Sequence, residues 1–180
     1  IMVSQLKVNE IIKQSGSSIS IGESGDTITL PSSATLTNFP TNTPYFAVSN
    51  TAAQNLSDAT WTKVTFNNEI LDSGSNFADN KFTVPTTGVY HFDFSTTGRD
   101  TDNDVDVTLI QLYKNGSAVP NFQTYLEFDF GTGAGRNLFV SGSAILSLTA
   151  NDYIESYVYV DSGGSPMTEK AYFSGHKLIT

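Results

Sequence analysis

The stretch that decides the fold reads FNNEILDSGSNF (Phe66–Phe77) and continues after three residues as KFTVPTTGVYHFDF (Lys81–Phe94). From Tyr90 to Phe94, aromatic residues alternate with polar ones, so one face of an extended chain is aromatic and the other is polar. A Pro-Thr-Thr-Gly turn signal precedes this run. The pattern predicts a β-strand over Gly88–Ser95 whose aromatic face lies in a core.

The chain from Tyr45 onward repeats this kind of pattern in short runs that are rich in β-branched and aromatic residues. Turn signals separate the runs, and no long stretch shows the 3.6-residue apolar period of a helix. This organisation predicts an all-β fold, an antiparallel two-sheet jelly roll or sandwich of about ten strands. The candidate strands are Tyr45–Ser49, Lys63–Asn67, Lys81–Val84, Gly88–Ser95, Val105–Tyr113, Asn137–Leu148, Tyr153–Val160 and Ala171–Leu178.

The run Tyr153–Val160 has bulky side chains on both faces. Three tyrosines and Glu155 share one face, while isoleucine, serine and valine residues share the other. A sandwich core covers only one face of a strand. A neighbouring subunit is therefore a candidate to cover the other face.

Residues 1–40 differ in composition from the rest of the chain, because they contain few aromatics and much serine, glycine and threonine. In IIKQSGSSISIGESGDTITLPSSATLTNF, apolar residues recur at intervals of roughly seven to nine residues, as in a loose repeat of very short strands. One copy has too little apolar surface to fold alone, whereas three intertwined copies would share a core. We therefore predict an extended β-rich appendage over residues 1–40, for trimerisation or attachment, and a head over residues 41–180. A flexible linker is the alternative for the appendage.

The charge and the residue composition exclude several classes of partner. The net charge of −9 argues against nucleic acids and anionic membranes, because their phosphates would repel the chain. No segment is apolar for long enough to cross a bilayer, so no membrane insertion is expected. The chain has no cysteine, so its stability must come from core burial or oligomerisation.

The opening motifs resemble the complement component 1q and tumour-necrosis-factor-like jelly-roll family, whose members show V-x-F-N-x-x-x-x-D…F and then F-x-V-P-x-x-G-x-Y-x-F. Three later stretches resemble the same family in the same order: LYKNGSAV (Leu112–Val119), SGSAILSLTANDYI (Ser141–Ile154) and FSGHKL (Phe173–Leu178). In the first of these, Asn115-Gly116 supplies the positive φ of a tight hairpin turn. The resemblance covers roughly residues 44–179. It implies a jelly-roll head that forms a homotrimer. We expect this head to work by binding and not as an enzyme, chiefly because the sequence contains no catalytic constellation.

The N-terminal segment carries a second resemblance. No collagen-like repeat precedes the head, and SISIGESGDTITLPSSATLTNF is similar to short N-terminal segments in structural proteins of tailed bacteriophages, including those of cyanobacteria. This implies a virion protein of the tail or a fibre, or otherwise an extracellular one. Its expected partners are other virion proteins, through residues 1–40, and a glycan or protein receptor on the host surface. The alternatives are a purely structural decoration or assembly protein and a fibre-borne glycan hydrolase.

The run RDTDNDVD contains the candidate metal ligands, which are the four alternating aspartates Asp100, Asp102, Asp104 and Asp106. Calcium takes about six to eight oxygen ligands and often binds such acidic loops. The spacing argues against an EF-hand, because Val105 stands where its glycine is required and Gln111 stands where its glutamate is required. We favour a solvated acidic loop, with a calcium site as the second interpretation.

Patterns typical of catalysis are weak. His91 and His176 are the only histidines, and neither has a metal-ligand companion two or four residues away. The run Ser141–Ser143 belongs to a strand and not to a nucleophile elbow. Glu127 and Asp129 fit a solvent-facing edge better than a glycosidase pair. No catalytic residue is predicted, and no cofactor other than the calcium considered above.

Two features remain as candidates for ligand contact. GTGAGR (Gly131–Arg136) lacks the Lys-Ser/Thr and the helix of a phosphate-binding loop, so it is interpreted as a strand connection that shapes a binding loop. Trp61 and Tyr125 sit beside predicted loops, where exposed aromatic rings can stack on sugars or anchor protein interfaces. A place in the core is the alternative for both side chains.

Overall fold

The computed structural model describes residues 24–27, 29, 43–100, 105–127 and 137–178. Contacts divide the chain into two units, Ile1–Phe39 and Pro40–Thr180, and all strands of the described residues lie in the second unit. The predicted appendage, residues 1–40, falls almost wholly outside the described residues, so its proposed role stays a prediction. The described residues contain no helix that is long and apolar enough to span a membrane.

The described residues form twelve strands and no helix, which confirms the all-β prediction. The strands are β1 (Tyr45–Ser49), β2 (Gln54–Asn55), β3 (Thr62–Lys63), β4 (Asn68–Asp72), β5 (Phe77–Ala78), β6 (Lys81–Thr83), β7 (Gly88–Asp100), β8 (Val105–Lys114), β9 (Ser117–Glu127), β10 (Leu138–Leu148), β11 (Tyr153–Ser162) and β12 (Pro166–Lys177).

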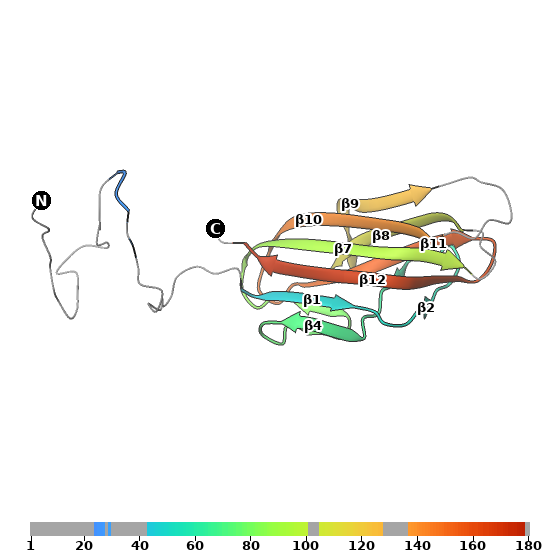
Figure 1. Cartoon of the computed structure of the whole chain (residues 1–180), viewed down its shortest axis with the longest axis horizontal. Coiled ribbons are helices and arrows are strands. Elements are labelled where there is room, and N and C mark those ends of the chain that lie inside the picture. The colour runs from blue at the N-terminus through green and yellow to red at the C-terminus, as the bar shows by residue number, and fades with distance from the viewer. Residues whose placement is uncertain (1–23, 28, 30–42, 101–104, 128–136, 179–180) are drawn as a thin grey trace, which may run out of the picture. The chain divides into compact units, whose positions relative to one another are not determined.

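The strands build two antiparallel sheets of six strands each. Sheet A has the order β10-β7-β12-β1-β4, with β2 paired to β12, and sheet B has the order β5-β6-β11-β8-β9, with β3 paired to β11. Figure 1 shows the strands of sheet A side by side, with β8 and β11 of sheet B behind them. The first and last strands, β1 and β12, pair along the middle of sheet A, as the predicted jelly roll requires.

An aromatic core lies between the two sheets. Phe46, Phe82, Phe92 and Phe173 are at most 2% exposed, and the ring centroids of Phe46 and Phe82 lie 4.6 Å apart. Tyr90 and Phe94 point into the same core, which confirms the aromatic face predicted for β7. Each of these side chains removes a large apolar area from water, so the core is the main source of stability.

The predicted strand over Lys63–Asn67 is wrong. β3 ends at Lys63 and belongs to sheet B, whereas the next strand, β4, belongs to sheet A, so residues 64–67 cross between the sheets. The N–H groups of Thr65 and Phe66 donate to the side-chain oxygens of Gln54 and Asn80, at 2.9 and 2.7 Å, instead of to a neighbouring strand. The sequence has apolar residues at alternate positions here, as a strand does, because Val64 and Phe66 both pack against the core from the crossing segment.

Asp152 ties two neighbouring turns together at one end of the sandwich. Its carboxylate accepts hydrogen bonds from Lys114 Nζ, Asn115 Nδ2 and the Thr149 N–H, each at 2.8 Å. Asn115 itself has a φ of 52°, as predicted for the first residue of the tight hairpin turn between β8 and β9. These hydrogen bonds and the ammonium of Lys114 lower the pKa of Asp152 from 3.8 to about 2.

Replacing Asp152 by asparagine is expected to flatten the acid dependence of stability. Because the folded-state pKa is lowered, the carboxylate contributes stability above about pH 4, and that contribution is lost as the pH falls through about 2. At pH 7 we expect Asp152→Asn to lower the midpoint of thermal unfolding by roughly 2–4 °C, the shift that about 1 kcal/mol produces in a chain of this size. Thermal unfolding from pH 7 to pH 2 measures both effects, and equal slopes for the two proteins would contradict the assignment.

Candidate functional site

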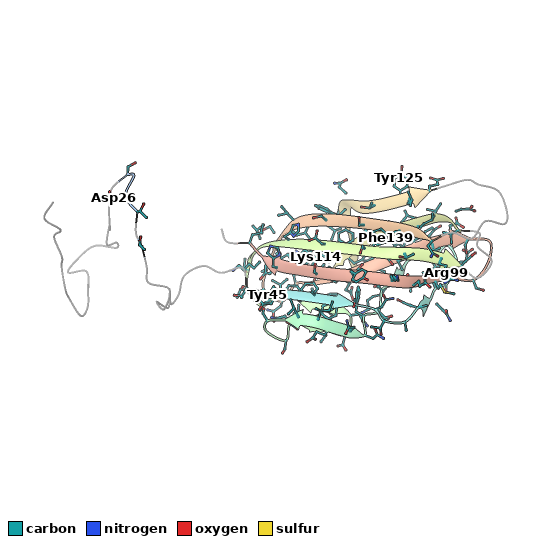
Figure 2. The ribbon with its side chains drawn as sticks, viewed as in Figure 1. Asp26, Tyr45, Arg99, Lys114, Tyr125 and Phe139 are labelled. Atoms are coloured by element: carbon teal, nitrogen blue, oxygen red, sulfur yellow. The ribbon has the colours of Figure 1, made fainter. Side chains whose placement is uncertain are left out.

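The outward face of sheet A carries most of the exposed large apolar side chains of the described residues. Six of the seven such residues lie on its strands, namely Tyr45, Ile70, Leu71, Phe139, Ile145 and Tyr172. Figure 2 labels Tyr45 on β1 and Phe139 on β10, on either side of β7 and β12. An open sheet face with this many apolar groups is typical of a surface that another molecule covers.

Small side chains, most of them polar, occupy the middle of this face. The strand register places Ser143, Asp93, Ser174 and Ala47 in one row across β10, β7, β12 and β1. A hollow of about 550 Å³ lies over β10, β7 and β12, and Phe139 and Tyr172 are among the residues that line it. The face is therefore hollowed in the middle and apolar at its margins, which suits the insertion of side chains from a partner.

The two histidines, which are far apart in the sequence, are neighbours on the outward face of sheet A. The antiparallel register of β7 and β12 places His91 opposite His176, and their ring centroids lie 5.3 Å apart. His91 Nε2 lies 2.9 Å from Ser143 Oγ, and its Nδ1 lies 3.5 Å from a carboxylate oxygen of Asp93. A single sequence does not give the register between distant strands, so no local signal could have predicted this pair.

The cluster of Ser143, His91 and Asp93 has the residue types of a nucleophilic triad but not its surroundings. Ser143 lies within the regular strand β10, as predicted for the run Ser141–Ser143. Successive N–H groups of a strand point in opposite directions, so those beside Ser143 diverge instead of converging as an oxyanion hole requires. The side chain of Asp93 is also 61% exposed, so solvent screens its electrostatic interaction with the imidazole ring of His91.

The four aspartates proposed as calcium ligands are only partly described. Asp100 is buried at the end of β7, and Asp106 is exposed near the start of β8. Asp106 is the extra residue of a β-bulge, because Asp161 pairs with Val107 while Ser162 pairs with Val105. Asp102 and Asp104 lie outside the described residues. Among the residues that are described, no three acidic or histidine side chains group as metal ligands, and the calcium site stays a prediction.

The outward face of sheet B carries a patch of partly buried aromatic rings. Tyr113 of β8 and Tyr157 of β11 stack with centroids 3.9 Å apart, and Trp61 contacts both Tyr113 and Tyr159. Burial raises the pKa of Tyr113, and burial is also the main cause of the raised pKa of Tyr157. The tyrosine face predicted for β11 is therefore covered in part by rings of the same chain.

A groove of about 310 Å³ opens beside this patch, and we call it the Trp61 groove. It is lined by Trp61, Val107 and Leu109 of β8, Gln123 of β9, and Tyr159 and Asp161 of β11. Trp61 is half-buried in it, and Tyr125, directly opposite Leu109 on β9, is 65% exposed. Both of these predicted contact residues therefore lie on the outward side of sheet B and not in the core.

The remaining sequence candidates lie at or beyond the end of β9. Glu127 is exposed as the last residue of that strand, in line with the predicted solvent-facing edge. Asp129 and the glycine-rich run Gly131–Arg136 lie outside the described residues, so the interpretations of both stay predictions.

The class of protein follows from this architecture: a two-sheet antiparallel jelly roll with an open apolar face on one sheet and an aromatic groove on the other. Residues 45–178 match the C1q domain family, and the chain belongs to that family. Domains of this kind typically form trimers and typically bind partners without catalysing a reaction. This match confirms the resemblance of the head motifs to the complement component 1q and tumour-necrosis-factor-like family.

Individual relatives are distant. The chain is 28% identical over 127 residues to the uncharacterized protein YqcC of Bacillus subtilis (strain 168), a match that covers 69% of this chain but only 34% of that protein. The globular domain of zebrafish complement 1qA is similar in structure, with a TM-score of 0.54 and 24% identity over 75% of this chain and 96% of that domain. Eiger TNF from S. frugiperda has a TM-score of 0.56 and 17% identity over 75% of this chain and 93% of its own. These two similarities concern the fold alone.

Proposed function

We propose that the chain is a homotrimeric binding head of a bacteriophage virion or tail fibre, which contacts the host cell surface through several copies of a weak site. The observation that carries the proposal is the open face of sheet A, where exposed apolar residues surround a hollow on a domain whose family typically forms trimers. The virion context rests on the N-terminal segment, residues 18–39, and its similarity to tailed-phage structural proteins.

In the proposed trimer, the face of sheet A is the contact between subunits. Burying Tyr172, Phe139 and Tyr45 would remove apolar surface that a single chain leaves in water. The outward face of sheet B and the loops at both ends of the sandwich would then remain accessible. Three identical sites held in one assembly raise the apparent affinity by about 10²–10⁴-fold over one site, provided that all can reach the same surface.

A cell-binding experiment tests this function. Fluorescently labelled full-length chain is added to a panel of cultured bacteria that includes cyanobacteria, and bound protein is measured by flow cytometry over a range of concentrations. We expect saturable binding to at least one strain, weakened about 100-fold or more in a variant that cannot assemble, Tyr172→Asp. Asn121→Asp is the control, because it adds the same charge at an exposed position on β9 of sheet B, away from the proposed subunit contact.

The outcome separates host contact from a purely structural role in the virion. Trimeric protein that binds none of the strains would favour a structural decoration or assembly role over host contact. Equal binding by the wild type and Tyr172→Asp would contradict the multivalent mechanism, even if cells are bound.

A further inference from the structure

We propose that the Trp61 groove binds a neutral carbohydrate, an inference that rests on the proposed role of the chain as a binding head. The groove is the place on the outward face of sheet B where an aromatic patch, an aliphatic floor and polar side chains meet. Because it lies on the sheet opposite the apolar face, trimer formation through sheet A would leave it open to the surroundings.

The floor and wall of the groove match the apolar side of a sugar ring. Val107 and Leu109 on β8 form an aliphatic floor, and Tyr159 pairs with Leu109 on the neighbouring strand. Trp61 packs against Tyr159 with centroids 5.6 Å apart and an interplanar angle of 49°. A pyranose ring presents C–H groups on its faces, so it can lie on such a surface without leaving polar groups unpaired.

Two polar side chains at the groove match the hydroxyl rim of the same ring. Gln123 offers an amide that both donates and accepts hydrogen bonds, and Asp161 offers a carboxylate that accepts them. Neither side chain has a hydrogen bond or ion pair with another residue of the described part of the chain. Both groups are therefore available to a ligand, and they lie on strands on either side of the aliphatic floor.

The charge of the groove selects against other ligands. None of the six described residues that line it is a lysine or arginine. Glu127 and Asp161 lie on either side of Val107, so an anionic sugar would be repelled. An aromatic cage for a quaternary ammonium ion needs rings around a common centre. Here Trp61 and Tyr159 pack on each other instead, so a neutral ligand fits better than a cation.

The size of the groove sets the length of the ligand. About 310 Å³ is at the lower limit of small-molecule sites, which suits one or two sugar units of a longer surface glycan. Tyr125, on the same face of β9, is 65% exposed and in place to contact the next unit. One such site binds its ligand weakly, and the apparent affinity rises when three copies bind the same surface together.

Trp61 makes the test specific for this groove, because it is the only tryptophan of the chain. The full-length protein is screened on an array of neutral hexose and N-acetylhexosamine oligosaccharides, with choline and sulfated oligosaccharides as comparison ligands. The best neutral ligand is then titrated while the tryptophan emission is recorded. We expect a saturable blue shift, a loss of affinity of about fivefold or more in Gln123→Ala and Asp161→Asn, and no change in Asn55→Ala, which removes an exposed amide elsewhere.

The outcomes distinguish this inference from the proposed function. A neutral glycan that binds without changing Trp61 emission, with full affinity in Gln123→Ala, would place recognition elsewhere and overturn the inference while leaving the binding head intact. Binding of choline or the sulfated ligands alone would overturn the ligand class. If Gln123→Ala binds cells as well as the wild type does, the inference is also overturned. If a glycan binds at Trp61 but the protein binds no cell, only the proposed host contact is contradicted.

Discussion

Replacing Tyr172 by aspartate is expected to convert the assembly from three chains to one. Tyr172 is 51% exposed on β12, the middle strand of sheet A, and it lines the hollow at the proposed subunit contact. In a trimer the new carboxylate would be buried without a partner, which costs several kcal/mol for each subunit. Size-exclusion chromatography with light scattering measures the change, from three times the 19.4 kDa of one chain to that mass itself.

Tyr125→Asp is the matched control for this substitution. It makes the same chemical change at an even more exposed tyrosine, but on β9 of sheet B. We expect this variant to keep the mass of the trimer and the unfolding midpoint of the wild type. An unchanged mass for Tyr172→Asp, or equal dissociation of both variants, would contradict sheet A as the contact face.

Replacing Phe173 by alanine is expected to cost about 3–5 kcal/mol of the free energy of unfolding. Phe173 is fully buried, and its ring lies 4.9 Å from that of Phe46 and 5.9 Å from that of Phe92, measured between centroids. Removing the ring leaves a cavity in a core that joins both sheets. Because a domain of this kind is stabilised by roughly 5–15 kcal/mol in total, the variant should lose a large part of its stability.

Denaturant unfolding followed by far-UV circular dichroism measures this loss. Tyr125→Ala deletes a similar ring from the surface, and we expect it to change the free energy of unfolding by less than about 0.5 kcal/mol. If Phe173→Ala does not fold, Phe173→Leu should show an intermediate loss at the same site. A loss below about 1 kcal/mol for Phe173→Ala would mean that the described core is wrong at this position.

The strands of the head were largely predictable, because each strand shows its own alternation of apolar and polar residues within a short segment of the sequence. β1 begins and ends at the predicted residues, and β7 begins at the predicted Gly88 but runs on to Asp100. β9 was not among the candidate strands, since Pro120 and Asn121 interrupt its pattern, although the predicted hairpin turn at Asn115-Gly116 implied a strand after it. An edge strand tolerates a proline there, because the N–H that proline lacks would otherwise face solvent.

The surfaces were much less predictable than the strands. Trp61 was a candidate for ligand contact on its residue type alone, but the groove depends on Gln123 and Asp161, which reach it from β9 and β11. The pairing of His91 with His176 likewise depends on the register of β7 against β12. Such neighbours are fixed by sheet order, and sheet order arises from long-range pairing that no local pattern encodes.

Hydroxyl-radical footprinting of the full-length protein in solution tests the central claim most directly, since it reads the accessibility of individual aromatic rings. Tyr45, Phe139, Tyr172 and Tyr125 are all exposed in a single chain. The trimeric head predicts fast oxidation of Tyr125 on sheet B and strong protection of Tyr45, Phe139 and Tyr172 on sheet A. Oxidation of all four rings at comparable rates would contradict it.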